Sequence, residues 1–302
     1  MTRPLKVGVQ LPEVERFVPW PELRDMALAT EAVGFDSLWV GDHLLYRTEE
    51  GVTGPWEAWS TLAALAAVTE RVQLGPLVAA TSFHNPAMLA KKAATVDEIS
   101  DGRLILGLGA GWNRIEYDAF GFPFDHRASR FEEAFTIIRT LLTVGEIDFE
   151  GEYYKVSDCV LAPPARPEGI PLMIGSEGPR VLAAALPHVQ IWNGWHSWYG
   201  NTHTGAADLN AKIDDACRAA GVTGTSIERT VTVLVRTPEG SHESLGSPNR
   251  ATSVSIGGSQ TEMAEKLAEF ADAGMHEIQL VVDPITIESI EWLGGVLTIL
   301  DT

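Results

Sequence analysis

The sequence predicts an α/β fold, namely a (β/α)8 TIM barrel with a hairpin inserted after the fourth helix and a long loop after the seventh strand. Apolar runs of strand length alternate with helix-like stretches along nearly the whole chain, which is the pattern of βα units around a parallel sheet. There are eight such runs, and most are apolar throughout, as expected for strands covered on both faces. Such a barrel often occupies ~250 residues or more as one domain, so residues 1–302 are expected to form a single domain. A doubly wound sheet with an appended domain is the alternative.

The first half of the chain supplies four βα units. Proline in the first turn of a helix is favoured because that position needs no N–H donor, and several of the helix-like stretches begin this way. Residues 145–164, GEIDFEGEYYKVSDCVLAPP, then interrupt the alternation with the Gly, aromatic and β-branched residues that are typical of a hairpin. The four strands begin at Leu5, Phe35, Arg71 and Arg103, and the helices begin near Trp20, Glu57, Pro86 and Ala128.

The second half of the chain supplies the other four units. After the seventh strand comes a polar stretch from Arg236, RTPEGSHESLGSPNRATSVSIGG, whose Gly, Ser and Pro content predicts a mobile loop or lid. The strands begin at Pro171, Val189, Arg229 and Glu277, and the helices begin near Pro179, Gly205, Gln260 and Pro284.

Composition excludes several classes of partner. The formal net charge of −19 disfavours nucleic acid and anionic membrane surfaces, because both require a basic face. Cys159 and Cys217 lack the spacing of a metal or redox site, which favours a reducing cytoplasm. The sequence contains neither a signal-peptide core at its start nor a run of ~18 apolar residues. We therefore expect a cytoplasmic protein that acts on small molecules.

Polar residues follow several of the predicted strands, and in a (β/α)8 barrel the active site lies at these carboxyl ends. The run LWVGDHLL ends strand two in Asp42 and His43, which are candidate catalytic residues. The alternative is a helix-capping Asp beside a structural His. The run WNGW after strand six places Trp192, Asn193 and Trp195 where a flat aromatic ligand could stack and hydrogen-bond, although the tryptophans could equally plug the barrel.

The loop GSEGPR after strand five predicts a phosphate site. Gly175 and Gly178 let the backbone approach a ligand closely, and a helix that opens at Pro179 would point free N–H groups at it, with Arg180 as a counter-charge. Glu177 is an unfavourable neighbour for a dianion, and turn geometry alone also explains the glycines.

Other chemistries find no support in the sequence. The GLGAG of strand four, Gly107 to Gly111, lacks the spacing of a dinucleotide fingerprint. The eight histidines are scattered, so no metal site is expected, and there is no G-x-S-x-G nucleophile elbow.

Several stretches together resemble one family, the bacterial luciferase-like flavin-dependent oxidoreductases. The resemblance rests on GDHLL, EAWSTLAALAAVTERVQLGPLV, FHNPAMLAKKAATVDEISDGRLILGLGAGWNRIEYDAFG, GSEGPR and the WN pair. It runs from Val7 to about Asn193 and weakly covers the last two units. Within the family the chain is most similar to the branch of oxidoreductases that use the deazaflavin coenzyme F420.

The resemblance implies a barrel with the cofactor ring across the strand ends and Asp42 and His43 beside its reactive face. It implies a bulge in strand three, with a non-prolyl cis peptide at Leu77 and Val78 and with Ala79 next to it, that backs the ring. It also implies the following roles for other residues. Asn113 and Glu116 line the ring or ribityl region, Gly175, Ser176, Glu177 and Gly178 hold the phosphate, and Trp56 and Trp59 wall the substrate pocket, although Trp59 also suits a structural role in the second helix.

Three functions follow as hypotheses. The first is hydride transfer between coenzyme F420 and a small organic substrate, with His43 as the acid/base or electrostatic partner. The second is an FMN-dependent monooxygenase fed by a separate flavin reductase. The third is a non-catalytic flavin-binding barrel. Relatives of this family are commonly homodimers, so a homodimer is expected.

Overall fold

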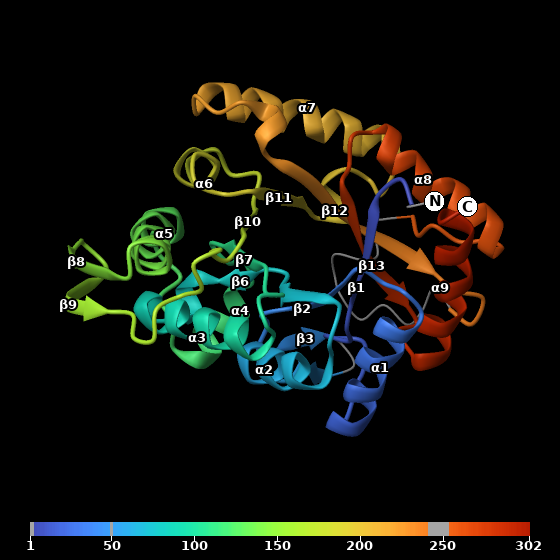
Figure 1. Ribbon diagram of the computed structural model, residues 1–302, viewed down its shortest axis with the longest axis horizontal. Coiled ribbons are helices and arrows are strands. Elements are labelled where there is room, and N and C mark those ends of the chain that lie inside the picture. The colour runs from blue at the N-terminus through green and yellow to red at the C-terminus, as the bar shows by residue number, and fades with distance from the viewer. Residues whose placement is uncertain (1–2, 49–50, 241–253) are drawn as a thin grey trace.

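The computed structural model describes residues 3–48, 51–240 and 254–302, and its centre is a parallel barrel (Figure 1). The strands run in the order β5-β2-β1-β13-β12-β11-β10-β7-β6. The strand β5 (Gln73–Pro76) and the short β6 (Ala79–Ala80) form one barrel position, interrupted between them, and a bridge from Leu74 to Leu104 closes the ring. The other seven positions are β1 (Lys6–Gln10), β2 (Ser37–Val40), β7 (Leu106–Gly109), β10 (Leu172–Gly175), β11 (Ile191–Gly194), β12 (Glu228–Arg236) and β13 (Glu277–Asp283). The prediction of a (β/α)8 barrel is confirmed, and the doubly wound alternative is wrong because the sheet closes on itself.

Helices follow the strands and cover the outside of the barrel (Figure 1). Side chains cap several of them where the sequence breaks from its strand, as when Asn85 accepts the N–H of Met88 and when Ser259 and Glu262 form a reciprocal capping box. Each outer helix begins within three residues of its predicted start. They are α1 (Trp20–Ala32), α2 (Ala58–Val68), α3 (Pro86–Ile99), α5 (Arg127–Thr143), α6 (Pro179–Ala185), α7 (His203–Ala219), α8 (Gln260–Asp272) and α9 (Ile287–Leu300).

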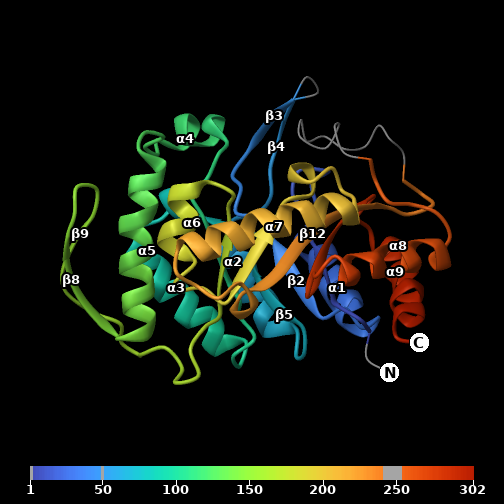
Figure 2. The ribbon, with the colours of Figure 1, turned by 90° about the horizontal axis from the view of Figure 1, so that it is seen from above.

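Three insertions depart from the simple alternation. The predicted hairpin is present as β8 (Glu146–Glu150) and β9 (Lys155–Val160). A second hairpin, β3 (Tyr46–Thr48) and β4 (Gly51–Thr53), and the short helix α4 (Arg114–Phe120) were not predicted, because each is too short to show a clear periodicity. Figure 2 shows α4 and the β3–β4 hairpin at the same end of the barrel. The smaller 3-10 turns are η1 (Thr81–Phe83), η2 (His196–Trp198) and η3 (Gly224–Ser226).

Residues 241–253 of the predicted lid lie outside the described residues. Just beyond them, Ile256 forms a parallel bridge to Val235 at the end of β12. None of the helices in the described ranges is long and apolar enough to cross a membrane.

Candidate active site

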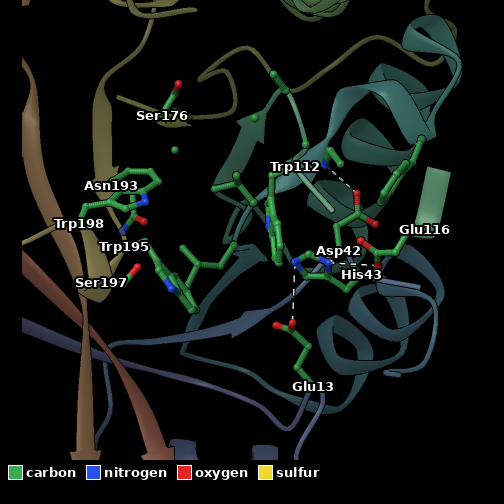
Figure 3. Close-up of a pocket in the computed structure, with 18 of the residues that line it drawn as sticks. Glu13, Asp42, His43, Trp112, Glu116, Ser176, Asn193, Trp195, Ser197 and Trp198 are labelled. Atoms are coloured by element: carbon green, nitrogen blue, oxygen red, sulfur yellow. Dashed lines mark hydrogen bonds and ion pairs between the residues drawn. The ribbon is translucent and has the colours of Figure 1, made fainter. Parts of the chain in front are cut away.

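A cavity of about 440 Å³ opens at the carboxyl ends of the barrel strands, where the βα loops meet (Figure 3). Carboxylates and a histidine lie on one side of it, and glycines, small apolar residues and indoles form much of the rest. The lining residues are Glu13, Val14, Asp42, His43, Tyr46, Leu77, Val78, Ala80, Phe83, Gly109, Ala110, Gly111, Trp112, Glu116, Gly175, Ser176, Glu177, Gly178, Asn193, Trp195, Ser197 and Trp198.

His43 lies between two buried carboxylates. Its Nδ1 is 2.9 Å from Oε2 and 3.1 Å from Oε1 of Glu116, and its Nε2 is 3.8 Å from Oε1 of Glu13 (Figure 3). Glu116 sits in the first turn of α4 and is fixed by the backbone N–H groups of Leu44 and Leu45, at 2.6 and 3.3 Å. The short helix that sequence periodicity missed therefore positions a carboxylate against the imidazole.

Glu13 completes this cluster from the loop after β1. Its carboxylate accepts hydrogen bonds from Gln10 Nε2 at 2.6 Å and from the hydroxyl of Tyr46. Gly41 makes room for it, since a Cβ at that position would lie 2.1 Å from Oε2 of Glu13. Sequence reasoning missed Glu13. The signal was a polar residue just after a strand, and the same signal identified His43 after the second strand.

The carboxylates control the charge of His43. Burial alone would lower its pKa, but Glu13, Glu116 and Asp42 outweigh burial and raise the pKa of His43 to about 9. The imidazole therefore holds a proton at neutral pH.

This bound proton should make folding stability depend on pH. An unfolded histidine has a pKa of ~6.5, so the stabilisation from His43 is complete below that pH and is lost as the pH rises through about 9. His43→Gln should remove this loss, which amounts to at most ~3 kcal/mol in the free energy of unfolding. Urea unfolding of both proteins at about pH 6 and about pH 9.5 measures it. An equal decline in both proteins would contradict the assignment.

Asp42 lines the cavity, but one of its carboxylate oxygens already contacts two neighbouring residues. Its Oδ2 accepts the backbone N–H of Ala80 at 2.9 Å and lies 2.8 Å from Nε2 of His84. These contacts tie the end of β2 to the end of the third barrel strand. The structure thus gives Asp42 a positioning role toward Ala80, in addition to its charge near His43.

The third strand forms one wall of the cavity. The Leu77–Val78 peptide is cis, as the family resemblance implied, and both residues line the cavity, whereas Ala79 is buried behind them and does not. Glycines face Val78 from two neighbouring strands. A Cβ on Gly109 or on Gly175 would lie 2.8 or 2.9 Å from Cγ2 of Val78. Because these glycines have no side chains, Val78 packs directly against their strands, and the part of the cavity bordered by Val78, Gly109 and Gly175 is here called the slot.

The loop after β10 also lines the cavity, through Gly175, Ser176, Glu177 and Gly178. The N–H of Gly178 donates to Oγ of Ser176 at 3.1 Å, and α6 is only seven residues long, so the helix end contributes less than predicted. Arg180 is not among the lining residues. It turns outward and pairs with Glu132 of α5 at 2.6 Å, which corrects its expected place as a counter-charge.

Adjacent residues of strand β11 point to opposite faces of the sheet, as strand geometry requires. Asn193 faces the cavity and donates from Nδ2 to Thr230 at 2.9 Å and to Gln279 at 2.8 Å. Trp192 is fully buried in the outer core and donates from Nε1 to the carbonyl of Ser176 at 2.8 Å, so the structure places Trp192 away from the cavity that it was expected to line. Trp195 does line the cavity, together with Trp198 of η2.

The remaining predicted residues lie off the cavity. Asn113 is buried and donates to the carbonyl of Leu45 at 3.4 Å, and Trp59, the second residue of α2, is buried in the core. Trp56 lines a separate small pocket and donates to the carbonyl of Val18 at 2.8 Å. Trp112, which sequence reasoning did not single out, lines the cavity instead and contacts the His43 ring edge-on at 5.7 Å.

Charge and ligand chemistry narrow what the cavity can hold. Among the described residues that line it there is no Lys or Arg. Likewise, within residues 3–48, 51–240 and 254–302 no cluster of three His, Cys, Asp or Glu side chains could hold a metal ion. The part of the cavity beside Val78 and the protonated His43 is therefore suited to an uncharged part of a ligand.

A closed parallel barrel with its cavity and its titratable groups at the carboxyl ends of the strands is the architecture of a barrel enzyme. The sequence model of the luciferase-like monooxygenase family matches residues 5–245, and the chain belongs to that family. This confirms the family that the sequence motifs indicated.

Individual relatives are similar over part of their length. The chain is 39% identical over 187 residues to the F420-dependent glucose-6-phosphate dehydrogenase of Amycolatopsis mediterranei (strain U-32), covering 60% of this chain and 54% of the relative. It is 31% identical over 182 residues to the 5,10-methylenetetrahydromethanopterin reductase of Archaeoglobus fulgidus (strain ATCC 49558 / DSM 4304 / JCM 9628 / NBRC 100126 / VC-16), covering 60% and 50%. The chain thus spans about half the length of the curated relatives it matches.

A solved structure shares the whole fold. An F420-dependent secondary alcohol dehydrogenase in complex with an F420-acetone adduct superposes with a TM-score of 0.82 at 19% identity, with 100% of both chains covered. At this identity the likeness establishes the barrel architecture alone.

Proposed function

We propose that the protein is an oxidoreductase that transfers a hydride between coenzyme F420 and a small organic substrate. The observation that carries this proposal is the cavity itself, in which the protonated His43 faces a glycine-edged slot. Relatives named for F420-dependent chemistry support the choice of cofactor. The activity follows from the joint presence of a proton donor and a planar binding slot.

The residues present fit a deazaflavin. Val78 and the glycines Gly109 and Gly175 would accept a flat ring, and Oδ1 of Asn193 offers an acceptor because its amide nitrogen is already committed. Ser176 and the backbone of residues 175–178 would hold the phosphate. When bound, the deazaflavin carries the hydride.

Residues of the protein donate and accept the proton. Glu116 and Glu13 orient the imidazole of His43 and keep it protonated, so Nε2 can donate a proton to a substrate oxygen. In the reverse direction the same nitrogen accepts the proton. Tyr46 and Gln10 hold Glu13 in place, and Trp112 contacts the ring of His43 and restricts the access of water to it.

The second candidate is an FMN-dependent monooxygenase that requires a partner reductase, and the family's name favours it. FMN ends in a phosphate monoester with close to two negative charges, whereas the phosphate of F420 is a diester with one. Arg180 pairs with Glu132 instead of facing the loop, and Glu177 adds a negative charge, so the loop suits the diester better.

A charge at Gly178 should weaken cofactor binding. Gly178→Asp places a carboxylate in the loop that is proposed to hold the phosphate, and we expect the dissociation constant of F420 to rise about tenfold or more. Gly178→Ala is the matched control, because its Cβ would only contact Ser176 Oγ at 3.4 Å and the backbone φ of −70° suits any residue. Fluorescence titration with F420 measures both variants. Equal affinity for Gly178→Asp and Gly178→Ala would show that the loop is only a turn.

Mass spectrometry and the absorption spectrum of the small molecule that copurifies with the protein test the cofactor directly. Turnover of that bound cofactor with a panel of alcohols and ketones then separates an enzyme from a non-catalytic flavin-binding barrel. We also propose that the protein is a cytoplasmic homodimer that acts without nucleic acid or a membrane. Sedimentation of the purified protein tests the oligomeric state.

A further inference from the structure

The cavity carries an excess of negative charge. Four carboxylates line it, those of Glu13, Asp42, Glu116 and Glu177. Among the described lining residues, the protonated His43 carries the positive charge that offsets them. The positive charge of His43 is shared by two partners, since Glu116 and Glu13 lie on either side of the ring. Glu177 is exposed and makes no ion pair within the described part of the chain.

Other parts of the cavity wall are aromatic. Trp112, Trp195 and Trp198 line the cavity with Val14, and their indoles offer stacking surface with few hydrogen-bonding groups. The hydroxyl of Tyr46 is already donated to Glu13. A ligand with an aromatic or aliphatic body would therefore find stacking surface on these indoles.

The part of the cavity beside His43 does not suit a phosphate ester. Proteins bind phosphate with Arg, Lys or clustered N–H donors. The described lining residues supply no Lys or Arg, and an anion near His43 would lie close to Glu13 and Glu116.

We propose that this site takes an uncharged ketone, aldehyde or alcohol with an aromatic or aliphatic body, and that Glu13 excludes phosphorylated and carboxylated groups from the part of the cavity beside His43. This inference rests on the proposed oxidoreductase function and names its substrate class. The single oxygen of the substrate faces His43, and its body packs against Trp112, Trp195 and Trp198. Relatives named for glucose 6-phosphate would then differ from this protein in substrate.

A matched pair of ligands tests the proposal. 4-Phenylbutan-2-one and 2-oxo-4-phenylbutanoate share the ketone and the phenethyl body, and the second compound carries a carboxylate in place of the methyl group, next to the carbonyl that faces His43. Calorimetric binding to the F420-loaded protein at neutral pH should favour the uncharged ketone by about tenfold or more. The rates of reduction, measured as kcat/KM with reduced F420, should show the same preference.

Two variants test whether charge causes the preference for the uncharged ketone. Glu13→Gln should reduce the preference severalfold, while Glu150→Gln on the distant β8–β9 hairpin, where Glu150 pairs with Lys155, should leave it unchanged. Ser197→Arg adds a cation to the lining and should improve binding of the carboxylate, which keeps the test valid if Glu13→Gln misfolds.

The outcomes separate the two proposals. Equal or tighter binding of the carboxylate by a protein that binds F420 would overturn the substrate class and leave the oxidoreductase function standing. The substrate class would also fall if Ser197→Arg and Glu13→Gln left the preference unchanged. Failure to bind F420 or FMN at all would overturn the proposed function itself.

Discussion

His43→Ala is expected to lower turnover by ~10² or more, because a positioned proton donor typically contributes that much to catalysis. The dissociation constant of F420 should change only a few-fold, since the slot is built from Val78, Gly109 and Gly175 on other strands. Steady-state kinetics at saturating cofactor, together with a cofactor titration, measure the two effects separately.

The raised pKa of His43 provides a second test of its role in catalysis. The pKa of about 9 belongs to His43 in the folded protein, so the activity of reduction should decline as the pH rises through that value. Glu116→Gln removes one of the carboxylates that raise this pKa and should shift the alkaline limb to lower pH. A His43→Ala variant with the rate of the natural protein would remove His43 from the mechanism.

Gly175→Leu is expected to abolish tight cofactor binding, with a loss on the order of 10²-fold in affinity. Its Cβ would lie 2.9 and 3.0 Å from the two methyl groups of Val78, so either Val78 or the new side chain must move into the slot. Overpacking of this kind also costs folding stability, typically ~1 to 3 kcal/mol. Fluorescence titration gives the affinity, and thermal unfolding shows that the variant is folded.

Val78→Ala supplies the control for this prediction. It removes the methyl groups that collide, so Gly175→Ala should be tolerated better in the Val78→Ala background than alone, which is a coupling that a double-mutant cycle measures. Full F420 affinity in Gly175→Leu would show that the slot is not where the ring binds.

Much of the fold could be predicted from the sequence because each parallel strand is a continuous apolar run and each outer helix has a clear start. The insertions that complete the site were harder to predict. α4 has seven residues and the β3–β4 hairpin has three residues in each strand, so neither shows enough periods to recognise. Yet α4 carries Glu116, and β3 carries Tyr46, which holds Glu13.

The site was predicted in part, and the errors have physical causes. Trp192 and Asn193 were both assigned to the cavity, but adjacent strand residues point to opposite faces, so one of them had to face outward. Arg180 was expected at the loop, but α6 packs beside α5, and Glu132 there captures the guanidinium. Trp112 could be recognised only once the fold had brought its loop beside His43, whereas Glu13 follows the first strand closely and was overlooked.

Titration of the protein without cofactor, using F420 and FMN at the same ionic strength, tests the central proposal most directly. The slot would accept either ring, so the comparison reports how the loop of residues 175–178 responds to a phosphate diester and to a monoester. We predict that F420 binds at least about tenfold more tightly, because the described lining residues supply no Lys or Arg to a dianion. Binding of FMN that is tighter by the same factor would contradict the proposal and favour the monooxygenase.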